Sequence, residues 1–312
     1  MSVTALEVCA GGGGQYLGLE EAGVESVAVL DKNPDACATM RANRPSLNVI
    51  EADLRTFDGT PYKGIDLLAG GVPCTPFSVG GKQLGEDDER HLFPHALRLV
   101  YEIRPRIVML ENVGGLGTAR FGGFRARVLT GLQSMGYVST WCLVQSCSYG
   151  VPQLRPRLIL ISVLGDEDYR FRWPRGTTEP TCFLGPALKN MMASNGWEGA
   201  DVWAEHNARA IAPTIVGGSE KHGGPDLGPT RARAAWLARG VDGKGIANGP
   251  PGAGTVLPRL TIAMVARLQG FPDSWVFTGN KTSRYRQVGN AFPPPVARAF
   301  GTEIVRYISS HK

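Results

Sequence analysis

The stretch EVCAGGGGQYLGLEEAG, residues 7–23, decides the fold of this chain. It predicts a short apolar strand, a glycine turn and a helix, because glycine adopts turn conformations that other residues avoid and helical spacing follows it. Such a unit places the unpaired N–H groups of a helix N-terminus beside the turn, where an anion binds. No register of the turn matches G-x-G-x-x-G, which excludes a nicotinamide oxidoreductase and favours a small carboxylate over a dinucleotide phosphate.

The alternation of strand and helix continues to about residue 165. Apolar runs rich in Val, Ile and Leu alternate with amphipathic stretches, which predicts an α/β fold with a doubly wound, mostly parallel sheet. Ligands of such sheets bind at the carboxyl ends of the strands. The predicted strands are 4–10, 26–31, 64–71, 106–113 and 158–164, and the predicted helices are 15–23, 34–43, 95–103 and 124–136.

The rest of the chain differs in composition. Residues 166–257 are interrupted by Gly and Pro and have weak helical periodicity, whereas helical spacing returns from residue 258. We therefore predict a first domain over 1–165, a smaller loop-rich domain over 166–257, and a C-terminal segment, 258–312, whose last helix packs back on the first domain.

Charge and cysteine usage narrow the class of protein. The net charge is +5, and residues 166–312 carry 18 Lys and Arg against 12 Asp and Glu, so a polyanion is a plausible partner of the second half. No export signal or membrane-spanning run is present, which predicts a cytoplasmic protein with no membrane partner. The six cysteines form no C-x-x-C pair, and we expect reduced thiols and no metal site.

Acidic, thiol and cationic side chains follow the predicted strands. Asp31 ends the predicted strand 26–31, and Asp53, in the stretch IEADL (50–54), follows the next strand along the chain. Both suit a nucleoside-bearing ligand, although acids there also cap helices. Cys74 comes after the predicted strand 64–71, and Glu111 comes at the end of the apolar run of 106–113. A carboxyl in a pocket has a raised pKa and serves as an acid, and a nearby arginine favours a thiolate. The sequence therefore predicts a reactive group at one rim of the sheet.

Six blocks occur in the order found in bacterial-type DNA cytosine-5 methyltransferases, and the chain resembles that family outside about 166–257. That family places its target-recognition region there. The blocks are EVCAGGGGQYLGLEEAG (7–23), GGVPCTPFSVGGKQ (70–83), ENV (111–113), YGVPQLRPR (149–157), RLTIAMVARLQGFP (259–272) and RQVGNAFPPPVA (286–297).

The resemblance implies a class I S-adenosylmethionine-dependent methyltransferase fold, Rossmann-like, and a covalent mechanism. Cys74 matches the nucleophile that adds to carbon 6 of cytosine, and Glu111 matches the carboxyl at ring nitrogen 3. Arg157, together with Arg155, matches the cation at the 2-keto oxygen. Asn112 matches a residue that orders the loop of Cys74.

The implied cofactor is S-adenosyl-L-methionine, with S-adenosyl-L-homocysteine as product and no metal. Cys9 and Lys32 stand where family members often have aromatic residues beside the adenine. The implied cofactor-binding residues are Ala10, Gly11, Gly13, Gly14, Asp31, Asp53, Leu54, Pro73, Asn290 and Ala291.

The implied substrate is double-stranded DNA with the target cytosine flipped out of the duplex. Residues 78–93, with glycines at 80, 81 and 85, suit a loop that closes over DNA. The arginines of the stretch 230–240 either contact DNA or are solvated on a helix that buries Trp236 and Leu237. The candidate DNA-binding residues are Val72, Ser78, Lys82, Gln153, Lys221, Arg231 and Arg233.

The expected setting is a restriction–modification system, with a cognate endonuclease as possible partner, or a solitary or phage-borne enzyme. We expect a monomer that associates with the nucleoid through DNA. Two alternatives stay open: a transfer RNA cytosine-5 methyltransferase of the same family and a catalytically silent DNA-binding relative.

Overall fold

A computed structural model of the chain describes residues 2–72, 92–165, 171–217 and 225–311. The described chain divides into two compact units. The first comprises Met1–Val144, Pro156–Pro174 and Ala297–Lys312, and the second comprises Gln145–Arg155 and Arg175–Val296. These bounds differ from the predicted domain bounds, because 145–155 and 258–296 group with the second unit and 171–174 group with the first.

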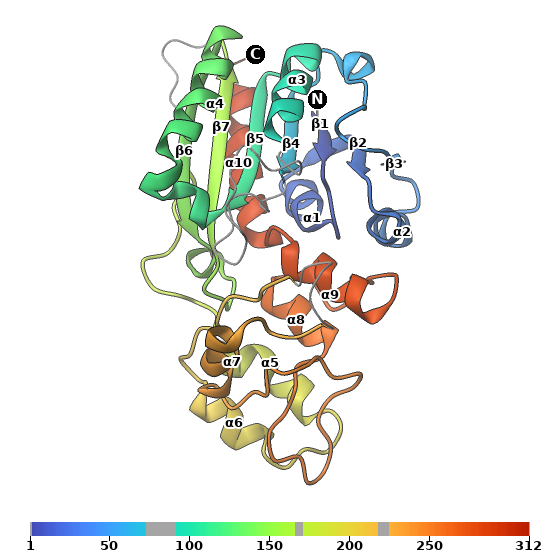
Figure 1. Cartoon of the computed structure of the whole chain (residues 1–312), viewed down its shortest axis with the longest axis vertical. Coiled ribbons are helices and arrows are strands. Elements are labelled where there is room, and N and C mark those ends of the chain that lie inside the picture. The colour runs from blue at the N-terminus through green and yellow to red at the C-terminus, as the bar shows by residue number, and fades with distance from the viewer. Residues whose placement is uncertain (1, 73–91, 166–170, 218–224, 312) are drawn as a thin grey trace. The chain divides into compact units, whose positions relative to one another are not determined.

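The first unit is built on a seven-stranded sheet in the order β3-β2-β1-β4-β5-β7-β6 (Figure 1). The pairs β1–β2, β2–β3, β1–β4 and β4–β5 are parallel, whereas β5–β7 is antiparallel. The prediction of a doubly wound, mostly parallel sheet is therefore confirmed. The strands are β1 (Val3–Val8), β2 (Val24–Asp31), β3 (Val49–Glu51), β4 (Leu67–Gly71), β5 (Ile107–Val113), β6 (Tyr137–Gln145) and β7 (Pro156–Leu164).

Helices provide the remaining regular structure of both units. A fully apolar side of α3 explains why that helix packs on the sheet, with Leu99 and Ile103 completely buried. The helices are α1 (Gly14–Glu21), α2 (Pro34–Asn43), α3 (Phe93–Ile103), α4 (Gly122–Ser134), α5 (Leu184–Ala193), α6 (Ala200–His206), α7 (Thr230–Leu237), α8 (Ile262–Leu268), α9 (Lys281–Asn290) and α10 (Pro294–Ser310).

Successive side chains of β1 point to opposite sides of the sheet of the first unit. Leu6 and Val8 belong to the apolar cluster that the sheet forms with α3 and α4. Gly301 of α10 packs against α1, where an added Cβ would lie 3.0 Å from Cδ2 of Leu19. Since side chains alternate along a strand, Glu7 points away from the cluster that holds its neighbours.

The strand order reverses between β1 and β4, and this is where a doubly wound sheet leaves a crevice for ligands. Glycine at position 70 lets the two strands approach closely, because a Cβ there would lie 2.8 Å from the carbonyl oxygen of Val8. The predicted cofactor and reactive residues of the first unit follow strands on both sides of this point.

Candidate active site

The glycine turn joins β1 to α1. Cys9, Gly11 and Gly13 all have positive φ, at 55°, 53° and 85°. Glycine adopts this conformation at no steric cost, whereas Cys9 is strained there. The N-cap residue of α1 is Gly13, which has no side chain to cap the helix. Its first N–H groups are thus suited to a carboxylate ligand.

Asp31, at the end of β2, holds this turn. Its Oδ2 accepts from the N–H of Gly11 at 2.8 Å and its Oδ1 from the N–H of Asn33 at 2.8 Å. Burial raises the pKa of the carboxyl. A carboxylate has about four acceptor positions, so the two bonds leave room for the hydroxyls of a ribose.

Asp53 follows β3 and is paired with the guanidinium of Arg55. Arg55 donates to it with Nε at 3.0 Å from Oδ1 and Nη2 at 2.6 Å from Oδ2. These hydrogen bonds lower the pKa of Asp53 to about 2, so the carboxylate is ionised at neutral pH. The Leu54 side chain is buried in the core, and only its backbone remains for the predicted cofactor contact.

The other predicted cofactor-binding residues lie in three places. Ala10 belongs to the glycine turn, where its carbonyl accepts from the N–H of Gly13 at 3.0 Å. Asn290 ends α9 in the second unit and is exposed, whereas Ala291 is buried. Pro73 lies outside the described residues.

Glu111 and Arg157 form a buried ion pair in the first unit. Glu111 lies near the carboxyl end of β5 and Arg157 near the start of antiparallel β7, and Nε of Arg157 is 2.5 Å from Oε1 of Glu111. The distance is that of an ion pair, although the Nε–H is not aligned as a hydrogen-bond donor. Gly71 of β4 pairs directly with Glu111. The sheet thus places an acid and a guanidinium beside the end of β4.

Asn112 connects this pair to the chain that leads to Cys74. Its Nδ2 donates to the carbonyl of Val72 at 3.0 Å, and both residues are buried. Cys74 itself lies outside the described residues. Burial raises the pKa of the Cys9 thiol, which makes that cysteine a poor alternative nucleophile.

Arg155 does not accompany Arg157. The Arg155 guanidinium is buried and donates to the carbonyls of Ile215, Gly289 and Ala291 at 2.8, 2.7 and 3.1 Å, all within the second unit. It precedes β7, so strand alternation does not relate its direction to that of Arg157. The structure thus shows the Arg155 guanidinium bound to backbone carbonyls, and its catalytic role stays a prediction.

Gln153 is also bound by neighbouring groups of the protein. Its side chain is fully buried, with Nε2 bonded to the carbonyl of Leu268 and to Oε1 of Gln269 at 3.0 and 2.9 Å. Its Oε1 accepts from the N–H of Ile215 at 2.8 Å. These bonds hold the Gln153 side chain within the second unit, and its DNA-binding role stays a prediction.

Val72, another predicted DNA-binding residue, is buried after β4, and the remaining DNA-binding predictions fall on α7 and on undescribed segments. Arg231 is exposed, whereas Arg233 forms an ion pair of 2.5 Å with Asp226. Trp236 is buried but Leu237 is 58% exposed, so only one of the two expected apolar residues packs inward. Ser78, Lys82 and Lys221 lie outside the described residues.

Two further groups make contacts that the sequence patterns do not predict. Glu7 is fully buried, and its carboxylate accepts from Oγ of Ser26 at 2.6 Å and from Nε2 of Gln15 at 3.4 Å. An acid inside an apolar strand was the available signal. Arg98 of α3 binds the turn that follows Asp53, a long-range contact for which the sequence has no local signal.

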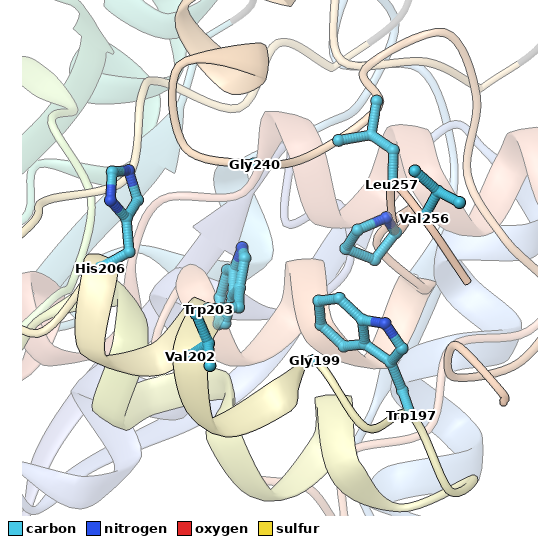
Figure 2. Close-up of a pocket in the computed structure, with 9 residues that line it drawn as sticks. Trp197, Gly199, Val202, Trp203, His206, Gly240, Val256 and Leu257 are labelled. Atoms are coloured by element: carbon cyan, nitrogen blue, oxygen red, sulfur yellow. The ribbon is translucent and has the colours of Figure 1, made fainter. Parts of the chain in front are cut away.

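A hollow of about 370 Å³ lies in the second unit (Figure 2). Trp197, Trp203 and Val256 are among its lining residues, and His206 is its titratable group. The indole N–H groups of the two tryptophans donate to backbone carbonyls at 2.7 and 2.8 Å. None of the predicted site residues lines this hollow.

The described parts of the chain contain neither a membrane-spanning helix nor a cluster of metal-binding side chains. No helix there is long and apolar enough to cross a membrane. No group of three or more His, Cys, Asp or Glu side chains is placed there to hold a metal ion.

Comparison with known proteins identifies the family. The model of the C-5 cytosine-specific DNA methylase family matches residues 3–306. The Type II methyltransferase M.NaeI of Lentzea aerocolonigenes is 51% identical over 97% of this chain and 75% of its own length. The Type II methyltransferase M.NgoMIV of Neisseria gonorrhoeae is 47% identical over 98% of both chains.

Solved structures agree on the fold. A prophage-encoded DNA modification methyltransferase of E. coli has a TM-score of 0.70 at 21% identity, over 99% of this chain and 100% of that one. DNMT2 of Spodoptera frugiperda has a TM-score of 0.67 at 18% identity, over 97% of this chain and 99% of that one. The predicted class I methyltransferase fold is therefore confirmed, and the chain belongs to the C-5 cytosine-specific DNA methylase family as a DNA cytosine methyltransferase.

Proposed function

We propose that this enzyme transfers a methyl group from S-adenosylmethionine to carbon 5 of a flipped-out cytosine in a specific duplex DNA site, by covalent attack of Cys74. The observation that carries the proposal is the buried ion pair of Glu111 and Arg157 beside the end of β4. Burying two charges is costly, and a catalytic task is a reason to retain them.

The residues of the first unit fit the cofactor. Membership of this methyltransferase family implies S-adenosylmethionine, which supplies an electrophilic methyl group when bound. The start of α1, which has glycine as its N-cap residue, suits its carboxylate, and the half-buried carboxylate of Asp31 suits the ribose hydroxyls. The ionised carboxylate of Asp53 suits an amino group of the adenine.

Carbon 5 of cytosine is a weak nucleophile, and the protein must activate the ring. The Cys74 thiolate forms a bond to carbon 6 while Glu111 delivers a proton to ring nitrogen 3. Arg157 stabilises charge at the 2-keto oxygen. After carbon 5 gains the methyl group, a base removes the proton of carbon 5. The electron pair of that C–H bond re-forms the C5–C6 double bond as the bond to sulfur breaks, and ring nitrogen 3 returns its proton to Glu111.

The substrate and setting follow from the same chemistry. A thiol reaches carbon 6 only when the base leaves the stack, so the cytosine is flipped at a cost of a few kcal/mol. The names of the two Type II relatives favour a role in restriction–modification, with a cognate endonuclease acting on the same site. A solitary or phage-borne modification enzyme would perform the same reaction.

The test is bisulfite sequencing of DNA from a host that expresses the chain, which reports activity, base and site together. Wild type is expected to leave unconverted cytosines at one sequence, and Cys74→Ser to leave none while still binding duplex DNA. Undiminished methylation by Cys74→Ser would disprove the covalent mechanism. Absence of modified cytosine in DNA, together with modified transfer RNA, would disprove the proposed substrate.

A further inference from the structure

The turn after β3 carries both predicted cofactor residues of that loop, Asp53 and Leu54. The carbonyl of Asp53 accepts from the N–H groups of Thr56 and Phe57, each at 3.1 Å, which closes the turn. No hydrogen bond of the Leu54 N–H is found among the described residues, and a backbone donor of this kind suits a ligand acceptor. The backbone direction at Leu54 therefore matters for binding.

Arg98 of α3 holds this turn from the helix side. Its Nη2 donates to the carbonyl of Leu54 at 3.0 Å and to the carbonyl of Phe57 at 2.9 Å. Its Nη1 forms an i,i+4 ion pair with Glu102. One guanidinium thus joins two carbonyls of the turn to a carboxylate of the helix.

Glu102 extends the contact to the end of the loop. Its Oε2 accepts from the N–H of Gly59 at 2.9 Å. Gly59 lies against α3 so closely that an added Cβ would be 2.9 Å from side-chain carbons of Leu99 and Ile103. The segment from Leu54 to Gly59 is therefore fixed to α3 at three backbone groups.

We propose that Arg98, supported by Glu102, is a positioning residue for cofactor binding: it sets the backbone of the Asp53–Phe57 turn on which the adenosine end of S-adenosylmethionine rests. The inference rests on the proposed cofactor site and adds a residue that makes no contact with the cofactor itself. A planar guanidinium serves three acceptors at once, whereas the lysine ammonium is a single point of charge.

The experiment measures S-adenosylmethionine binding to the full chain by titration calorimetry, with KM for the cofactor and kcat on duplex DNA. The variants are Arg98→Ala, Arg98→Lys and Glu102→Gln. The control is Arg306→Ala, which removes an arginine from an i,i+3 ion pair on α10 of the same unit. Hydrogen exchange of the 54–59 amides reports the turn directly.

Arg98→Ala and Arg98→Lys are expected to raise the Kd and KM for the cofactor by about tenfold, since two charge-assisted hydrogen bonds to the turn are weakened or lost. The kcat at saturating cofactor and the Kd for DNA are expected to stay within about twofold of wild type, because Arg98 acts on cofactor binding. A tenfold change in the Kd for the cofactor is large enough to detect against a twofold scatter. Glu102→Gln has a smaller effect in the same direction, and Arg306→Ala has none.

The inference is overturned if Arg98→Lys binds the cofactor as wild type does, or if kcat falls while Kd is unchanged. Should Arg98→Ala fail to fold, Arg98→Lys and Glu102→Gln decide the matter. A wild-type chain that binds no S-adenosylmethionine would instead refute the proposed cofactor site, so the two failures are distinguishable.

Discussion

Replacing Glu7 with glutamine is expected to stabilise the protein above neutral pH. Burial raises the pKa of Glu7 from 4.5 to about 7. The folded state therefore binds a proton more tightly than the unfolded state, and this contribution to stability is lost as pH rises from 4.5 to 7. A pKa shift of that size corresponds to about 3 kcal/mol of unfolding free energy, which is fully lost above pH 7.

Glutamine keeps the shape of Glu7 but does not titrate. Its amide oxygen still accepts from Ser26, and its NH₂ group takes the place of Oε2, which faces Nε2 of Gln15. A flip of the Gln15 amide turns its Oε1, which has no hydrogen-bond partner among the described residues, toward that NH₂ group. The difference in unfolding free energy between Glu7→Gln and wild type is therefore expected to grow by about 3 kcal/mol from pH 4.5 to pH 8.

The assay is urea unfolding at pH 5, 6, 7 and 8, followed by a fluorescence signal of the first unit. Glu51→Gln is the control, because Glu51 is an exposed glutamate of the same sheet. Parallel pH profiles for wild type and Glu7→Gln would refute the reasoning. So would a wild type that gains stability relative to Glu7→Gln as pH rises, since Glu7 would then be ionised in the fold.

Three other predictions concern catalysis, DNA binding and packing. Glu111→Gln keeps an acceptor for its arginine but cannot deliver a proton, so kcat is expected to fall by about 10²- to 10⁴-fold with the cofactor Kd unchanged; a normal rate would contradict it. The logarithm of DNA affinity should fall steeply with the logarithm of salt concentration. Replacing the exposed Arg231 with Ala should reduce this slope by about one, and replacing Arg233, which is ion-paired with Asp226, should reduce it by less. Gly70→Ala is expected to destabilise the first unit by about 1–3 kcal/mol in thermal melts, because its Cβ would meet β1 at 2.7 Å, whereas Gly249→Ala, with open space around it, should melt as wild type does.

Much of the fold could be read from local patterns. The strands at 26–31 and 106–113 were predicted almost to the residue, because buried parallel strands are continuous apolar runs. The domain bounds were harder to place, since Gln145–Arg155 belongs by sequence to the run before β7 but packs with the second unit.

Sequence by itself determined the glycine turn, the alternation of strand and helix, and the acids that follow successive strands, because each depends on the conformational preferences of adjacent residues. Only the tertiary structure decided what those side chains contact. Glu111 of β5 pairs with Arg157 of the neighbouring antiparallel strand β7. Arg155 donates to three backbone carbonyls, and Arg98 binds a turn that lies 44 residues away in the sequence. Periodicity constrains which face a residue takes, whereas its partner is chosen by packing between segments that are distant in the chain.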